Sequence, residues 1–131
     1  MERTPTANAR GKTQAAKQLL DKAAKALEFP LTTKVAGISR HQKALENVMN
    51  NTFFILVREP DNKFDPNAIA VKAWGKYPLG YVPRYVAEAL APLLDAGVVS
   101  RKAKFVRKNR SEKAPDLPVG LSIKIFEKKK D

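Results

Sequence analysis

The chain has 131 residues, enough for one domain, and 44% of them are hydrophobic, which excludes a wholly disordered protein. Its 25 Lys and Arg outnumber 13 Asp and Glu, so its formal net charge is +12. Such an excess favours a polyanionic partner such as nucleic acid. The absence of cysteine and the single histidine exclude disulfides and disfavour metal sites. With no apolar stretch typical of a signal peptide or a membrane span, we expect a cytoplasmic protein.

The basic charge is concentrated toward the two ends of the chain. Residues 1–28 carry six basic and three acidic side chains, and residues 29–100 carry eight and six. Residues 101–131 carry eleven basic and four acidic side chains, a net charge of +7. This end charge attracts phosphates regardless of base sequence, so it supplies affinity without selectivity.

The N-terminal part of the chain is predicted to lie outside the main domain. Residues 1–11 are polar and predict a disordered arm, and residues 12–29, rich in Ala, Leu and Lys, predict a basic amphipathic helix that ends at Pro30. The helix has an apolar side of mostly alanine and no aromatic anchor, which favours docking on the domain over lying along nucleic acid or a membrane. Residues 30–127 form the predicted domain, and residues 128–131 a charged tail.

From residue 31 the pattern is typical of short strands. Gly37 suggests a bulge or a close backbone approach within the first of them. The most regular alternation places Ile69, Val71 and Ala73 on one face. The predicted strands are 31–39, 52–59, 68–74, 79–82, 98–107 and 119–127, the last with Leu121, Ile123 and Ile125 on one side.

Two helical segments interrupt these strands. Residues 41–50 predict one or two helical turns. A longer helix is predicted to begin at Pro83 and stop at Gly97, with Pro92 bending or loosening its last turn. We therefore expect a mostly β fold with two or three helices: a small OB-like β-barrel of about six strands, plus the N-terminal helix. A two-layer α+β sheet is the competing expectation.

The stretch "REPDNKFDPNAIAV" (58–71) places an acidic loop between two strands of a basic chain. Its carboxylates Glu59, Asp61 and Asp65 are one set that could hold Mg²⁺, as in nucleases. We favour the alternative that Asp61 and Asp65 bond to nearby backbone amides. Two prolines, at 60 and 66, restrict the loop, so we expect it to be rigid.

A rigid loop holds Phe64 at a fixed point, where it either plugs the core or stands exposed. An exposed aromatic ring can stack on a nucleobase, and such stacking contributes about 1–3 kcal/mol per base. The neighbouring carboxylate of Asp65 repels phosphate, so it suits a hydroxyl or a donor on a base edge. A chain end that lacks the next phosphate offers such a hydroxyl.

Two stretches, "LVREPDNKFDPNAIAV" and "LGYVPRYVAEALAPLLDAG", together with "VAGIS" at 35–39, resemble the HIRAN domain family. The resemblance covers about residues 31–127. The family occurs as free-standing bacterial and phage proteins and at the front of eukaryotic fork-remodelling ATPases. The resemblance implies a modified OB-like barrel and, by analogy with the fork-remodelling member, capture of a single-stranded DNA 3′ end.

The resemblance also implies roles for individual residues. Phe64 matches the aromatic that stacks on the terminal base, and Asp65 matches the acid that accepts from the 3′-hydroxyl. Tyr81 falls where the fork-remodelling member has a histidine, and Arg84 where it has a lysine near the phosphates. The same member has an Arg–Tyr pair in its first strand, and this sequence has Thr33 and Lys34 there.

We accordingly expect a non-enzymatic module that binds single-stranded DNA, with DNA ends, replication forks or damaged DNA as substrates and a DNA-repair or helicase enzyme as partner. We expect no cofactor, metal or catalytic residue. A protein–protein adaptor with a basic surface and a Mg²⁺-dependent nuclease are the alternatives. The candidate DNA-binding residues are Lys34, Arg58, Asn62, Phe64, Asp65, Tyr81, Arg84, Lys102, Lys104 and Arg107, with Lys108 and Arg110 extending the basic track.

Overall fold

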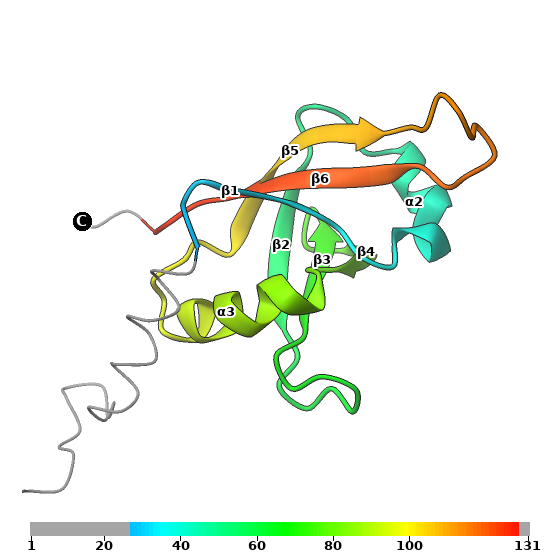
Figure 1. The fold of residues 1–131 in the computed structure, drawn as a ribbon. Coiled ribbons are helices and arrows are strands. Elements are labelled where there is room, and N and C mark those ends of the chain that lie inside the picture. The colour runs from blue at the N-terminus through cyan, green and yellow to red at the C-terminus, as the bar shows by residue number, and fades with distance from the viewer. Residues whose placement is uncertain (1–26, 129–131) are drawn as a thin grey trace, which may run out of the picture.

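The computed structural model describes residues 27–128, which form six strands and three short helical segments. The predicted arm and basic helix lie outside the described residues, except for 27–29, which are not helical. The tail beyond residue 128 also lies outside them. In chain order the elements are β1 (Leu31–Lys34), the 3₁₀ helix η1 (Ile38–His41), α2 (Gln42–Glu46), β2 (Phe53–Arg58), β3 (Ile69–Ala73), β4 (Tyr77–Tyr81), α3 (Arg84–Asp95), β5 (Lys102–Asn109) and β6 (Gly120–Ile125) (Figure 1).

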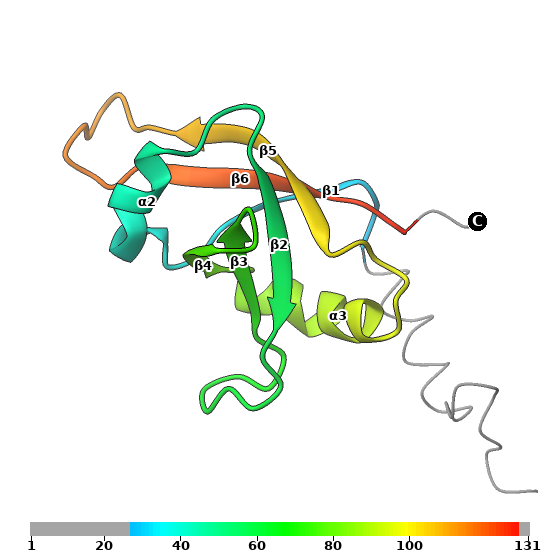
Figure 2. The same ribbon diagram turned by 180° about the vertical axis from the view of Figure 1, so that it is seen from behind.

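All six strands belong to one antiparallel sheet in the order β1-β6-β5-β2-β3-β4. The sheet curls, and its two outer strands meet just beyond the end of β1 (Figure 2). There Ala36 donates its backbone N–H to the carbonyl of Tyr81 (2.7 Å) and accepts from the Tyr81 N–H (2.9 Å). The mostly β prediction is therefore confirmed, as a curled half-barrel rather than a flat two-layer sheet.

Gly80 permits this closure of the sheet. Its φ is +150°, and a Cβ at this position would overlap the carbonyl oxygen of Ala36 and lie 2.9 Å from Cγ1 of Val35. The residue before Tyr81 therefore has to be glycine for the two backbones to approach so closely.

The predicted inward faces form the core of the half-barrel. The β6 residues Leu121, Ile123 and Ile125 are fully buried, as are Ile69 and Val71 on β3. The predicted apolar face of α3 is also buried and packs into the same cluster: Val86, Leu90, Leu93 and Leu94. These alternating and helical patterns therefore predicted the correct faces.

The strand boundaries differ from the prediction where the backbone turns. The first strand ends at Lys34, because Gly37 (φ +77°) starts η1. In the β3–β4 hairpin, Pro78, predicted as turn, belongs to β4; it lies beside an irregularity between Val71 and Lys72, a position that tolerates a residue without N–H.

The predicted helix stop at Gly97 is confirmed by its hydrogen bonds. Gly97 has φ +74° and donates to the carbonyl of Leu94 (3.0 Å), and Val98 donates to that of Leu93 (2.9 Å). These two bonds form a Schellman motif, the usual end of a helix at glycine. Within residues 27–128, no helix is long and apolar enough to cross a membrane.

Candidate nucleic-acid interface

The loop between β2 and β3 is folded around the side chain of Asn62. Its Oδ1 accepts from the backbone N–H groups of Phe64 (2.9 Å) and Asp65 (3.1 Å), and its Nδ2 donates to Oε1 of Glu59 (3.0 Å). These bonds fix the backbone on both sides of the loop tip. The prediction that the loop is held by side-chain bonds to backbone amides is correct for Asp65, but Asn62 supplies the part expected of Asp61.

Asp65 holds the second half of the loop and connects it to α3. Its Oδ1 accepts from the N–H of Asn67 (2.9 Å), and its backbone carbonyl accepts from Ala68 (3.0 Å). Its Oδ2 lies 3.7 Å from Nε of Arg84, whose guanidinium also donates to the carbonyl of Phe64 (3.0 Å). The loop tip is therefore fastened to the first turn of α3.

Glu59 connects the loop to β4. Its Oε1 accepts from the hydroxyl of Tyr81 (2.9 Å) as well as from the amide of Asn62. The sequence suggested Glu59 only as a metal ligand, so this positioning role was missed. The contact is formed across 22 residues and has no local sequence signal.

The hydrogen bond to Glu59, burial and the negative charge of Glu59 together raise the pKa of Tyr81 above its usual value of 10. A tyrosine with a raised folded-state pKa contributes stability that is complete below pH ~10 and is lost as the pH rises through the folded pKa. We expect Glu59→Gln to lower this pKa, because the charge is removed. Ultraviolet titration of tyrosinate, with Tyr81→Phe to identify the Tyr81 component, measures the shift. Identical titration curves for Glu59→Gln and the parent would contradict it.

Phe64 stands at the tip of this loop with 87% of its surface exposed. The loop extends away from the half-barrel in both ribbon views (Figures 1 and 2). Of the two positions that the sequence left open for Phe64, the structure shows the exposed one, and the alternative that Phe64 plugs the core is wrong. An exposed ring held by an ordered backbone loses little conformational entropy when it stacks on a ligand.

Arg58 is engaged inside the protein. Its Nε lies 2.9 Å from Oδ1 of Asp95, and its Nη1 donates to the carbonyl of Ala68 (2.9 Å). Only 18% of its side chain is exposed. These bonds attach the base of the loop to the end of α3, so Arg58 serves the structure of the site in this conformation.

The structure divides the remaining candidates into two groups. Asn62, Phe64, Asp65, Tyr81 and Arg84 are joined by the contacts above. Lys102, Lys104 and Arg107 lie on β5, which is far from the loop tip in both ribbon views (Figures 1 and 2).

The two residues at the first-strand positions differ in exposure. Thr33 is buried, whereas Lys34 is exposed. Of the two, only Lys34 is therefore available to a ligand.

The structure also bears on the hypothesis of a Mg²⁺-dependent nuclease, and it exposes Tyr85, which the sequence analysis did not single out. Among residues 27–128, no three His, Asp or Glu side chains are grouped so as to hold a metal ion, so Glu59, Asp61 and Asp65 do not form the Mg²⁺ site considered as the less favoured alternative. Tyr85, beside Arg84, is 79% exposed. The sequence could have identified Tyr85 as an exposed aromatic residue, because it lies in the first turn of a predicted helix on the side away from the apolar face.

Comparisons with known proteins agree with this fold. The model of the HIRAN domain family matches residues 29–127. A crystal structure of a protein from Lactobacillus plantarum is similar, with a TM-score of 0.58 and 24% identity over 73% of this chain and 89% of that one. The crystal structure of the HIRAN domain of human HLTF has a TM-score of 0.55 and 23% identity over 76% of each chain.

A third similar structure is the NMR structure of the HLTF HIRAN domain in its DNA-bound conformation. Its TM-score is 0.52, with 22% identity over 74% of this chain and 72% of that one. At these identities the solved structures show the fold alone. The comparison with curated proteins gave no match.

Proposed function

Because this chain belongs to the HIRAN domain family, we propose that it is a non-enzymatic module that binds single-stranded DNA at a 3′ end through Phe64 and Asp65. The observation that carries the proposal is an aromatic ring that is 87% exposed on a loop fixed by four side-chain hydrogen bonds, with a carboxylate beside it. The DNA-bound conformation of the HLTF HIRAN domain supports DNA as the ligand.

Phe64 supplies the binding surface for a base. Its ring is free to stack on the face of any nucleobase, which contributes about 1–3 kcal/mol and requires no particular sequence. The exposed Tyr85 and the half-exposed Tyr81 offer further aromatic surface on the neighbouring elements α3 and β4. The site therefore favours an unpaired base over one stacked inside a duplex.

Asp65 supplies selectivity for an end. Its Oδ1 already accepts from Asn67, but a carboxylate has about four acceptor positions, and 18% of the side chain is exposed. A terminal hydroxyl can donate to it, whereas a phosphate at the same place meets a like charge. Arg84, with 77% of its side chain exposed, lies beside the carboxylate and would hold the phosphate of the preceding nucleotide.

This chemistry fits DNA substrates that present a free single-stranded end, such as fork-like or damaged DNA. A helicase or repair enzyme as partner would supply any remodelling of that DNA. OB-like folds bind oligonucleotides partly through the loops between their strands, and in this half-barrel we expect the β2–β3 loop to do so.

The proposal is tested by fluorescence anisotropy with one labelled single strand that ends in either a 3′-hydroxyl or a 3′-phosphate. We expect the 3′-phosphate to weaken binding by at least about tenfold, or ~1.4 kcal/mol, because it faces Asp65. Asp65→Asn should remove most of this preference, since the amide has no charge. Equal affinities of the parent protein for both strands would overturn end recognition. An absence of any DNA binding at ~50 mM salt would instead favour a protein adaptor.

A further inference from the structure

The sheet of this protein carries positive charge only. Its six strands contain eight Lys and Arg and no Asp or Glu: Lys34, Arg58, Lys72, Lys102, Lys104, Arg107, Lys108 and Lys124. Every acidic side chain between residues 27 and 128 lies in a helix, a loop or a terminal segment. In a chain with 13 acidic residues, this separation makes one layer of the molecule uniformly basic.

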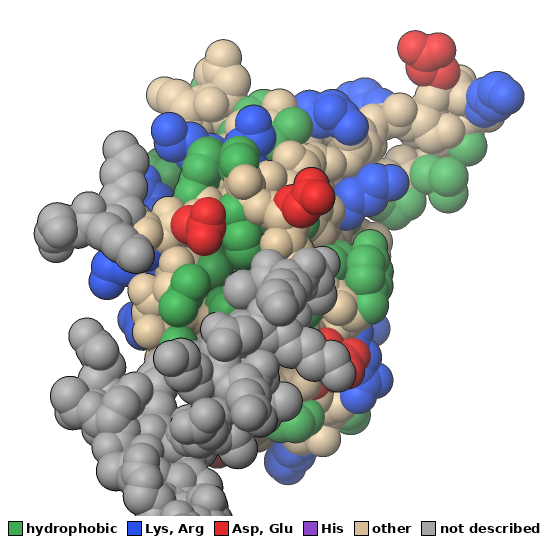
Figure 3. Space-filling model, turned by 60° about the vertical axis from the view of Figure 1, so that its left-hand side comes forward, with side chains coloured by type: hydrophobic (Ala, Val, Ile, Leu, Met, Phe, Trp, Pro, Cys, Tyr) green, Lys and Arg blue, Asp and Glu red, His purple; other side chains and the backbone are tan. Residues whose placement is uncertain are grey.

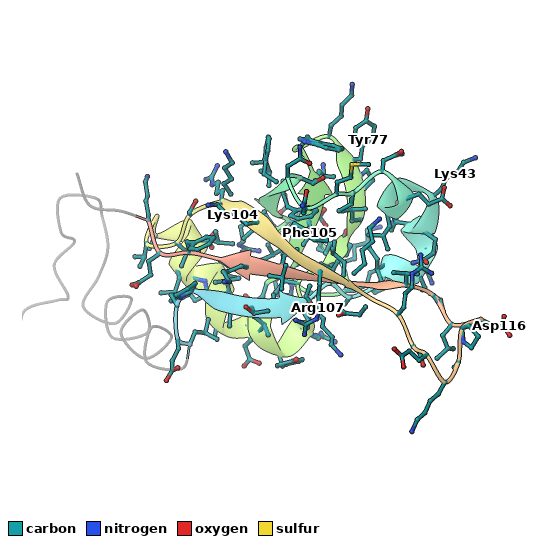
Figure 4. The ribbon with its side chains drawn as sticks, turned by 90° about the horizontal axis from the view of Figure 1, so that it is seen from above. Lys43, Tyr77, Lys104, Phe105, Arg107 and Asp116 are labelled. Atoms are coloured by element: carbon teal, nitrogen blue, oxygen red, sulfur yellow. The ribbon has the colours of Figure 1, made fainter. Side chains whose placement is uncertain are left out.

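The register of the strands gathers most of these charges on the outer face of β1, β5 and β6. Lys104 pairs with Lys124, and Arg107 pairs with Ser122, which in turn pairs with Lys34 of β1. The neighbouring β6 residues Ile123 and Ile125 face the core, so Ser122 and Lys124 lie on the opposite face, where Lys124 is partly exposed and Ser122 is covered. Figure 4 looks down on these strands and labels Lys104 and Arg107 on β5. In the space-filling view, several Lys and Arg side chains lie over the upper part of the molecule, with single Asp and Glu side chains among them (Figure 3).

The lysines of this face lie over aromatic rings. The Nζ of Lys102 is 4.5 Å from the ring centre of Phe53, and that of Lys104 is 5.5 Å from the ring centre of Phe126. Both rings are half-buried, so the face presents ammonium groups rather than a projecting apolar side chain. Such a face suits a charged backbone and lacks the apolar anchor that a membrane requires.

These charges do not stabilise the fold through ion pairs. The two ion pairs between described residues, Arg58–Asp95 and Arg84–Asp65, lie at the loop and α3. Like charges directly opposite on neighbouring strands, as in Lys104 and Lys124, are destabilising. The fold thus keeps a cluster of cations that its own described residues do not neutralise, which is the pattern of a surface for a polyanion.

We propose that this outer face, formed by Lys34, Lys102, Lys104, Arg107 and Lys124, is a second surface, which binds the phosphate backbone of duplex DNA. Duplex DNA suits it because a double helix carries one negative charge per ~1.7 Å, and because the two rings of the face, Phe53 and Phe126, are half-buried with lysine ammonium groups over them. The inference rests on the proposed function in taking DNA as the polyanion. It goes beyond it in assigning a separate surface and a different DNA form.

The positions of the two surfaces indicate which form of DNA could contact both. The loop that carries Phe64 and the strands β5 and β6 lie at opposite ends of the half-barrel in both ribbon views (Figures 1 and 2). One straight single strand therefore does not reach both surfaces. A DNA molecule whose single-stranded end lies at the loop and whose duplex portion lies on the sheet contacts both.

The test measures the salt dependence of binding to a blunt hairpin duplex whose 3′ end carries a phosphate, so that the Phe64 surface does not contribute. We expect the triple variant Lys102→Gln, Lys104→Gln, Lys124→Gln to reduce the slope of log affinity against log salt by about 2.7, since each phosphate contact on B-DNA contributes ~0.9. The charge-matched control, Lys43→Gln, Lys76→Gln, Lys113→Gln, changes lysines outside this face and should have a much smaller effect. Equal slopes for the two triple variants would overturn the proposal.

Two further measurements separate this proposal from the proposed function. Phe64→Ala should leave duplex affinity unchanged, and the triple variant should keep the preference for a 3′-hydroxyl on a single strand. If the parent protein showed no preference for a 3′-hydroxyl but kept the expected salt dependence on duplex DNA, end recognition by the Phe64 loop would be contradicted and the duplex surface would not. If the triple variant unfolds, Lys104→Gln by itself should reduce the slope by about 0.9, and no reduction would contradict the duplex surface.

Discussion

Gly80→Ala is expected to destabilise the protein by about 2–4 kcal/mol, the largest effect of any single methyl group in the sheet. The added Cβ overlaps the carbonyl oxygen of Ala36, and a backbone φ of +150° is unfavourable for alanine. The nearer contact is with a backbone oxygen, and the other, Cγ1 of Val35, belongs to a buried β-branched side chain with little freedom to move, so the strands themselves have to separate. Urea denaturation monitored by circular dichroism measures the loss.

Gly120→Ala is the matched control for this substitution. Gly120 also lies in a strand, but its φ is not positive, and a Cβ there would meet Asn109 at 3.4 Å, an ordinary van der Waals contact. We expect a change within about 1 kcal/mol. Similar losses for both variants would show that closure of the sheet at Ala36 and Tyr81 does not depend on the missing side chain of Gly80.

The closure of the sheet matters for function because Tyr81 takes part both in the closure and in the contacts that hold the Phe64 loop. Its backbone pairs with Ala36 across the closing edge, and its hydroxyl donates to Glu59 at the base of the Phe64 loop. A shift of β4 away from β1 therefore moves the hydroxyl on which Glu59 and Asn62 depend. For this reason Gly80→Ala should weaken DNA binding even in the fraction of molecules that stay folded.

The sequence predicted those parts of the fold that follow from local periodicity and turn chemistry. Alternation identified Leu121, Ile123 and Ile125 as core, and helical spacing together with Gly97 identified α3 and its end. These signals are local because each reports which side of one element is apolar. The two prolines predicted a rigid loop around Phe64, but the sequence left open whether the ring plugs the core or stands exposed, and only the structure shows it exposed.

The contacts that assemble the site were not predictable from local pattern. Arg58 reaches Asp95 across 37 residues, and Glu59 receives Tyr81 across 22. The antiparallel register of β2, β3 and β4 brings Tyr81 to Glu59, and the packing of α3 against β2 brings Asp95 to Arg58. A single sequence states neither the register nor the packing. The same reason explains why Lys102, Lys104 and Arg107 were assigned to one track with the loop, whereas the strands place them on another face.

Phe64→Ala is expected to weaken binding of single-stranded DNA by about 1–3 kcal/mol, or roughly five- to 150-fold in Kd. The ring is 87% exposed, so its removal creates no cavity, and the free energy of unfolding should change by less than about 0.5 kcal/mol. The backbone bonds from Asn62 do not involve the ring and stay in place. Anisotropy titrations and urea denaturation of the same samples separate the two effects.

Two further variants show whether the loss comes from stacking. Phe64→Trp should restore binding, because a larger aromatic face stacks at least as well, while Leu117→Ala removes an exposed apolar side chain from the distant β5–β6 loop and should leave Kd unchanged. If Phe64→Ala and Leu117→Ala had the same small effect, Phe64 would not be the stacking residue. Binding of single strands would then have to arise from cations such as Lys34 and Arg84 alone, and its salt dependence would rise accordingly.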